Sequence, residues 1–178
     1  MNILIVLAHP EPKSLNGRLA RFARDTFSKQ NYQVRISDLY SKEFDPLEAG
    51  RHFSVRQNSD CFDVQSEQRF NWERGSLPSE VKEQIENIFW ADLLLLQFPL
   101  WWFGPPAILK GWMDRVFVYG GLYSSSRTHD CGPCRGKRAL VCVTAEAADL
   151  TISNQSSSIR VRLTLYLPPS RRLGTPYR

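Results

Sequence analysis

Residues 93–117 contain the pattern that most constrains the fold of this chain. Four consecutive leucines at 93–96 form an apolar run that is short enough for a buried strand. Pro99 ends that strand, three large aromatic residues follow at 101–103, and 104–106 (Gly-Pro-Pro) open a helical pattern. Open α/β sheets bind flat ligands at such strand-to-helix connections. Because a core does not require three consecutive aromatic residues in a turn, the segment predicts a stacking surface for a planar ring.

Apolar runs alternate with helical patterns along most of the chain, which predicts an α/β protein. Strands are expected over 3–8, 33–38, 93–97 and 138–143, and helices over 15–29, 66–72, 78–89 and 105–117. The first helix should begin after Ser14 and turn one apolar face inward, formed by Leu15, Leu19, Phe22, Ala23 and Phe27. Strands that alternate with helices form a parallel sheet, and right-handed crossovers make that sheet doubly wound. The irregular segment 39–75 is too long for a simple connection and is predicted to be a functional excursion.

The pattern fails after residue 143. Residues 151–158 are rich in Ser, Asn and Gln, 159–167 alternate in polarity and fit one strand, and 168–178 are predicted to be disordered. A doubly wound sheet of this type needs a further strand and a closing helix, so its C-terminal part is expected to be incomplete. We therefore predict one domain over 1–150 and an irregular basic tail over 151–178.

Charge and composition exclude several classes of function. The net charge is +5, but five arginines and one acid lie within 149–178, so that segment carries most of the excess. Basic character confined to a tail does not predict a nucleic-acid-binding face. No apolar run is long enough to span a membrane, and the amino terminus has no signal-peptide pattern. We expect a cytoplasmic protein with reduced thiols at Cys61, Cys131, Cys134 and Cys142.

Three blocks of the chain carry a resemblance to a known family. They read LIVLAHPEPKSLNG (4–17), SDLYSKEFDP (37–46) and ADLLLLQFPLWWFGPPAILKGWMDRVF (91–117), and residues 130–144 match more loosely. In these blocks the chain resembles the flavodoxin-like NAD(P)H:quinone oxidoreductases, the DT-diaphorase group. The resemblance spans 1–144. It implies a homodimer that binds FAD (FMN is the alternative) and passes a hydride from NAD(P)H to a quinone.

The resemblance also implies which residues form the site. The cofactor-binding positions are His9, Ser14, Leu15 and Asn16 beside the flavin phosphates, Pro99, Leu100, Trp101, Trp102 and Phe103 along the ring, and Thr144 after the fourth strand. The substrate positions are Trp102, Phe103 and Tyr123. A helix N-terminus favours an anion, which suits the phosphate assignment. The resemblance assigns no catalytic acid or base in this chain and no metal.

The chain departs from the family pattern after its fourth strand. The family has Thr-Thr-Gly-Gly where this chain has Thr144-Ala145-Glu146-Ala147. Glycine lets the backbone approach a ligand closely, so a side chain here is expected to hinder the flavin, and Glu146 adds a negative charge. The family's assisting tyrosine and histidine have no counterpart. We hypothesise that residues from about 145 onward arise from a frameshift or truncation, and resequencing the locus tests this.

Other interpretations remain open beside this one. The chain could be a regulatory flavoprotein that docks on a potassium-efflux transporter, or an inactive truncated paralogue. The aromatic residues at 101–103 could also form a dimer patch. Cys131-Gly132-Pro133-Cys134 spells a thioredoxin dithiol motif, but it precedes a strand instead of opening a helix. A zinc site near His129 would need two more ligands at useful spacing.

Overall fold

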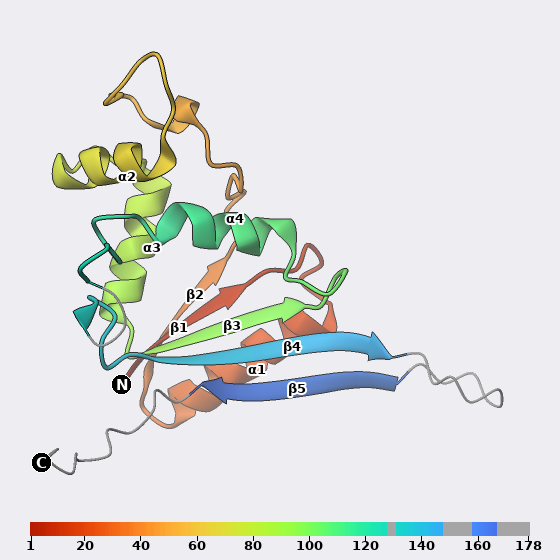
Figure 1. The fold of residues 1–178 in the computed structure, drawn as a ribbon. Helices are drawn as coiled ribbons and strands as arrows, with labels where there is room; N and C mark the ends of the chain where they lie inside the picture. The colour runs from red at the N-terminus through yellow and green to blue at the C-terminus, as the bar shows by residue number, and fades with distance from the viewer. Residues whose placement is uncertain (128–130, 148–157, 167–178) are drawn as a thin grey trace, which may run out of the picture.

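A five-stranded sheet in the order β2-β1-β3-β4-β5 organises the structure. The computed structural model describes residues 1–127, 131–147 and 158–166. The strands are β1 (Asn2–Leu7), β2 (Gln33–Asp38), β3 (Leu93–Pro99), β4 (Arg138–Ala147) and β5 (Ser158–Tyr166). The first four are parallel, and β5 pairs antiparallel with β4 (Figure 1). The predicted doubly wound parallel sheet is therefore confirmed for β1 to β4.

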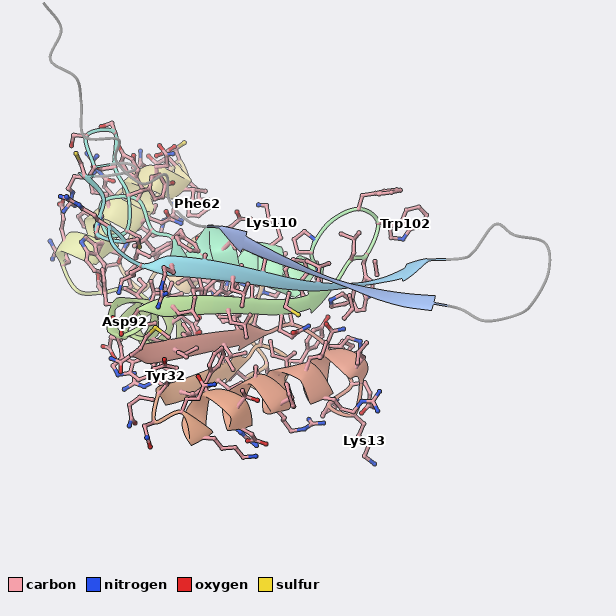
Figure 2. The ribbon with its side chains drawn as sticks, turned by 90° about the horizontal axis from the view of Figure 1, so that it is seen from below. Lys13, Tyr32, Phe62, Asp92, Trp102 and Lys110 are labelled. Carbon is pink, nitrogen blue, oxygen red and sulfur yellow. The ribbon has the colours of Figure 1, made fainter. Side chains whose placement is uncertain are left out.

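Helices cover both faces of this sheet. They are α1 (Leu15–Lys29), α2 (Val64–Glu73), α3 (Ser79–Trp90) and α4 (Ala107–Val116), with a short 3-10 turn at Gly50–His52. One face packs against α1, and the opposite face packs against α3 and α4 (Figures 1 and 2). Successive residues of β1 point to opposite faces, so Ile3 and Ile5 lie in the α1 core while Leu4 and Val6 lie in the larger core on the other side. Strands buried on both faces are continuous apolar runs.

The fourth strand is longer than the sequence predicted. It continues beyond Val143 to Ala147, because residues 144–147 pair with 158–161 of β5. An antiparallel neighbour gives the backbone of this segment hydrogen-bond partners and keeps it extended. The strand predicted over 159–167 is present as β5. The predicted disorder at 168–178 lies outside the described residues, and the proposed boundary at residue 150 stays a prediction.

The long excursion, which contains α2, is held in place by hydrogen bonds within itself and to α4. The buried Glu67 carboxylate on α2 accepts hydrogen bonds from Arg56 Nε at 2.8 Å and from the backbone N–H groups of Gln57 and Asn58 at 2.9 and 3.3 Å. The start of the excursion lies against α4, where Arg115 Nη1 donates to the Asp45 carbonyl oxygen at 2.7 Å. These contacts give the segment a defined path.

One part of the predicted helix packing was wrong. Phe22 was expected on the inward face of α1, but its side chain is 70% exposed, and the smaller Ala20 is buried beneath the sheet instead. Ala20 packs in this core together with the partly buried Leu19 and Phe27. No helix in the described part of the chain is both long and apolar enough to cross a membrane.

Candidate functional site

The loop after β1 and the first turn of α1 form one wall of the candidate site. Ser14 caps the helix, and its Oγ accepts from the Gly17 N–H at 3.1 Å. His9 Nδ1 accepts from the Glu11 N–H at 3.0 Å, which places the proton of a neutral imidazole on Nε2. The first N–H groups of a helix lack partners within the helix and favour an anionic ligand. This wall therefore suits a phosphate group.

The loop after β3 forms the second wall and has an unusual backbone. Trp101 and Gly104 exchange backbone hydrogen bonds at 2.9 and 3.0 Å, so the chain turns within residues 101–104. Both central residues have positive φ, 48° at Trp102 and 62° at Phe103. Turns of this kind favour Gly, Asn or Asp, and a bulky residue in this region costs on the order of 1 kcal/mol. Such strain concentrates at functional sites.

The turn presents its aromatic rings to solvent. The side chains of Trp102 and Phe103 are 96% and 95% exposed, and Trp102 projects from the tip of the loop (Figure 2). Trp101 is less exposed, and its ring centroid lies 6.0 Å from that of His9. The two loops therefore meet through these rings across the carboxyl ends of β1 and β3.

These walls and the end of β4 enclose a cavity of about 670 Å³. Its lining contains all ten residues that the sequence assigned to the cofactor, which are His9, Ser14, Leu15, Asn16, Pro99, Leu100, Trp101, Trp102, Phe103 and Thr144. The volume is typical of sites for small molecules. The structure thus brings the predicted residues together, while their binding of a flavin stays a prediction.

A chain of buried polar side chains crosses the floor of the cavity. Gln97 Nε2 on β3 donates to Asn16 Oδ1 at 2.7 Å, and Asn16 Nδ2 donates to Thr144 Oγ1 at 2.8 Å. The Thr144 carbonyl oxygen also accepts from the Leu100 N–H at 2.8 Å. These bonds connect the three segments that line the cavity.

The lining has almost no acid–base chemistry of its own. Among the described residues of the lining, His9 alone has an ionisable side chain, and the others are aromatic, apolar, hydroxyl or amide. Such a surface can bind and orient a flat molecule and exclude water from it.

The structure does not bring Tyr123 to this cavity within one chain. Tyr123 instead lines a separate hollow of about 650 Å³ beside α2 and α4, together with Met113 and Phe117. Its ring packs edge-on against Tyr119, with centroids 5.4 Å apart. Glu48 in the same hollow has a raised pKa because burial disfavours its charged form. The substrate role of Tyr123 stays a prediction.

The two cysteines of the Cys-Gly-Pro-Cys motif lie in successive turns that lead into β4. Cys131 is exposed and Cys134 is half-buried. Burial raises the pKa of the Cys134 thiol, although Lys137 partly opposes this shift. The motif precedes a strand and does not open a helix, so it lacks the helix N-terminus that activates the first thiol of a redox dithiol. Within the described ranges, His, Cys, Asp and Glu side chains form no group of three that could hold a metal ion.

Two residues of the site were not among the predicted cofactor positions, although Ala145 lies in the segment expected to approach the flavin. Ala145 lines the cavity because it follows Thr144 at the carboxyl end of β4. Gln97 lies under the floor and is buried. A signal for Gln97 was present, since it is the only polar residue between Leu93 and Pro99, and a buried polar side chain needs a specific partner.

A parallel sheet with its cavity at the carboxyl ends of the strands defines a doubly wound ligand-binding protein. The chain belongs to the flavodoxin-like fold family, whose model matches residues 1–163. It is 41% identical over 143 residues to ribosyldihydronicotinamide dehydrogenase [quinone] of Mus musculus. Among solved structures, the chain is similar to a candidate quinone reductase from Klebsiella pneumoniae, with a TM-score of 0.75 and 32% sequence identity. It is also similar to the NAD(P)H:quinone oxidoreductase of Methanothermobacter marburgensis, with a TM-score of 0.64 and 29% sequence identity.

The chain spans less than two thirds of each of these proteins. The matches cover 80% of this chain and 62% of the mouse protein. They cover 82% of this chain and 60% of the Klebsiella protein, and 83% of this chain and 65% of the Methanothermobacter protein. The family model's match over residues 1–163 contains the whole cavity lining.

Proposed function

We propose that this chain binds a flavin in the cavity and acts as an oxidoreductase that passes a hydride from NAD(P)H to a quinone. The observation that carries the proposal is the cavity itself, which joins an aromatic turn to a helix N-terminus at the carboxyl ends of parallel strands. The names of the related proteins support the same activity. A bound flavin would accept the hydride from NAD(P)H and release it to the quinone.

The residues of the cavity fit a flavin in two places. The capped N-terminus of α1 suits the phosphate, and the loop 99–103 suits one face of the ring. The third place differs from the family pattern, since Ala145 lines the cavity and β4 continues through residues 145–147 as a paired strand. A methyl group there keeps the backbone farther from a ring than glycine would. We propose FAD as the cofactor, with FMN as the alternative.

The protein's own contribution is to bind and orient the flavin and the substrates and to shield them from water. Trp102 and Phe103 would wall the open side of the cavity, where NAD(P)H and then the quinone bind in turn. The backbone of the loop 99–103 would hold the ring edge. The hydrogen bond from the Leu100 N–H to Thr144 fixes this loop to the sheet, so the wall keeps its position when substrates exchange.

We further propose a cytoplasmic homodimer. Trp102 and Phe103 are nearly fully exposed, and aromatic side chains of this kind are enriched at interfaces. A second copy would cover these two side chains. The Tyr123 side chain of that second copy could then reach the substrate, whereas Tyr123 of the same chain lies away from the cavity. The oligomeric state can be measured by analytical ultracentrifugation with and without flavin.

Flavin retention is the first test of the proposal. We expect the purified chain, after incubation with FAD and desalting, to keep a flavin absorbance spectrum, and we expect FMN under the same treatment to be kept less well. A retained spectrum makes quinone reduction by NAD(P)H the next assay. Folded protein that retains neither flavin would end the enzyme proposal for this chain. Flavin retention without quinone reduction would favour the docking role on a transporter.

Trp102→Asn should separate stability from substrate binding. Asparagine tolerates positive φ, so we expect the thermal midpoint to stay equal or rise slightly. Loss of the aromatic wall should raise the KM for a quinone by roughly fivefold. Phe22→Asn is the matched control, because it removes another exposed aromatic side chain that lies on α1 outside the cavity lining. A KM that stays unchanged in Trp102→Asn would remove Trp102 from the substrate site.

A further inference from the structure

We infer that Gln97 sets the direction of the buried hydrogen-bond chain and thereby makes Thr144 a hydrogen-bond donor to the molecule in the cavity. The inference rests on the proposed function for the identity of that molecule. The acceptor would be a carbonyl oxygen or an unprotonated ring nitrogen, which are the acceptor atoms that a flavin ring carries. Gln97 is thus a positioning residue, since it acts on the ligand through Asn16 and Thr144.

The donors of the chain all point the same way. Gln97, whose side chain is 1% exposed, donates from Nε2 to Asn16 Oδ1. Asn16 then donates from Nδ2 to Thr144 Oγ1. A hydroxyl group carries one proton and can accept through its lone pairs, so accepting from Asn16 leaves the Thr144 proton free to be donated. Among the described residues no acceptor takes that proton, and Thr144 lines the cavity.

The direction is not decided by Asn16 alone. A side-chain amide has nearly the same shape when it is turned over, with oxygen and nitrogen exchanged. If Asn16 turned over, its Oδ1 would face Thr144 and take the hydroxyl proton, and the cavity would meet lone pairs instead of a donor. While Gln97 keeps the orientation seen in the structure, its N–H group prevents this, because it would then face the Asn16 N–H group and both would be buried donors without an acceptor.

The position of Gln97 is itself well determined. It lies on the central strand β3, directly across from Cys142 on β4, and its side chain is buried. Burial raises the pKa of Cys142, so this neighbour stays a neutral thiol. The Gln97 carbonyl oxygen also accepts from the Ala8 N–H at 3.0 Å, which ties β3 to the start of the phosphate-side loop.

The first test measures flavin affinity in a double-mutant cycle. Gln97→Met should raise the dissociation constant for FAD about tenfold, because Asn16 loses the donor that holds its direction. In a Thr144→Val background the same change should have no further effect, because the hydroxyl through which Gln97 acts is gone. An equal loss in both backgrounds would mean that Gln97 acts only by supporting the fold, and it would overturn the inference.

Gln84→Met is the matched control for this cycle. Gln84 is also a buried glutamine, on α3, and its Oε1 accepts from Ser37 Oγ at 2.6 Å and from Trp112 Nε1 at 3.1 Å. It does not line the cavity. We expect this control to lower the thermal midpoint to a similar extent as Gln97→Met while leaving the dissociation constant for FAD unchanged. A tenfold loss in the control would show that the affinity simply follows stability.

A second measurement tests the direction without any ligand. In the structure the Asn16 Nδ2 group donates to Thr144, so Thr144→Val should shift the side-chain amide resonances of Asn16 and speed their exchange with solvent. Unchanged resonances would mean that Nδ2 faces Gln97, and the inference would be wrong. If the wild-type chain binds no flavin, the proposed function fails, and this measurement still decides the direction of the chain.

Discussion

Replacing Gly17 with alanine is expected to destabilise the chain by about 1–3 kcal/mol and to weaken flavin binding at the same time. Gly17 lies in the first turn of α1, and a Cβ atom there would stand 2.1 Å from the Pro12 carbonyl oxygen. Alanine is the better helix former by about 1 kcal/mol, so propensity alone predicts the opposite sign. The steric overlap with backbone should prevail, because relieving it requires the loop between β1 and α1 to move.

The effect on binding follows from what that loop does. Ser14 and His9 belong to it and line the side of the cavity that we propose for the flavin phosphates. Moving Pro12 away from the helix would displace both of them, and we expect the dissociation constant for FAD to rise at least as much as in Gln97→Met. Urea unfolding measures the stability, and fluorescence titration with FAD measures the affinity.

Gly111→Ala is the matched control for this prediction. A Cβ atom at Gly111 in α4 would stand 2.0 Å from the Pro46 carbonyl oxygen, so the overlap is as severe as at Gly17. Pro46 belongs to the excursion and does not line the cavity. We therefore expect a similar loss of stability with an unchanged affinity for FAD. A Gly17→Ala variant as stable as wild type, or equal losses of affinity in both variants, would contradict the prediction.

Glu80→Ala is expected to lower the free energy of unfolding at neutral pH by about 2 kcal/mol. Its partner Arg115 is 2% exposed, and Arg115 Nη2 donates to Glu80 Oε1 at 2.8 Å. Arg115 Nε already lacks a hydrogen-bond partner in the described structure. Removing Glu80 would leave a buried cation whose direct contacts among the described residues are the Asp45 carbonyl oxygen and the Phe44 ring, with the Glu48 carboxyl group nearby. The half-exposed Glu80 side chain keeps the cost below that of a fully buried pair.

The same pair predicts the sign of a pH dependence. Burial raises the pKa of Glu80, but hydrogen bonds from Arg115 and from its own backbone N–H outweigh burial, and the pKa is lowered below its ordinary 4.5. A depressed carboxyl pKa contributes stability that is fully present above the unfolded-state value and is lost as the pH falls through the folded-state value. The difference between wild type and Glu80→Ala should therefore shrink under acid. A stability difference that stays constant as the pH is lowered from neutral to below the ordinary carboxyl pKa would contradict this prediction.

Arg115→Met should cost less than Glu80→Ala, although it removes more hydrogen bonds. Methionine leaves no buried charge, and Glu80 is exposed enough to be hydrated once its partner is gone. The opposite order of the two variants in urea unfolding would mean that the bond to Asp45, and not the charge balance, dominates at this position.

The sequence determined the strands, the helices and the lining of the cavity. Apolar runs and helical spacing identified β1 to β4 and α1 to α4 to within a few residues. Given a parallel order, the loops after β1, β3 and β4 must meet at one edge, because the carboxyl ends of parallel strands share it. The ten predicted cofactor positions could therefore be gathered before any coordinates were known, although residue matching to a family chose the individual residues.

Only the tertiary structure decided how those residues are presented. The positive φ angles of Trp102 and Phe103 follow from the paired ends of their turn, and nothing in two aromatic residues favours that backbone. The antiparallel pairing of β5 extended β4 past Val143, since a neighbouring strand outweighs a weak local pattern. Tyr123 proved to lie apart from the cavity within one chain, which no local signal could show.

The hydrogen bonds under the cavity show most clearly what the sequence leaves open and the tertiary structure decides. Gln97 and Asn16 are 81 residues apart, and Asn16 and Thr144 are 128 apart. The sequence holds only a signal that was not used, a single polar side chain at Gln97 within an apolar strand, which needs a buried partner. Which partner it finds, and in which direction the donors point, depends on the packing of α1 against the sheet and on the register of β3 and β4, both of which exist only in the folded chain.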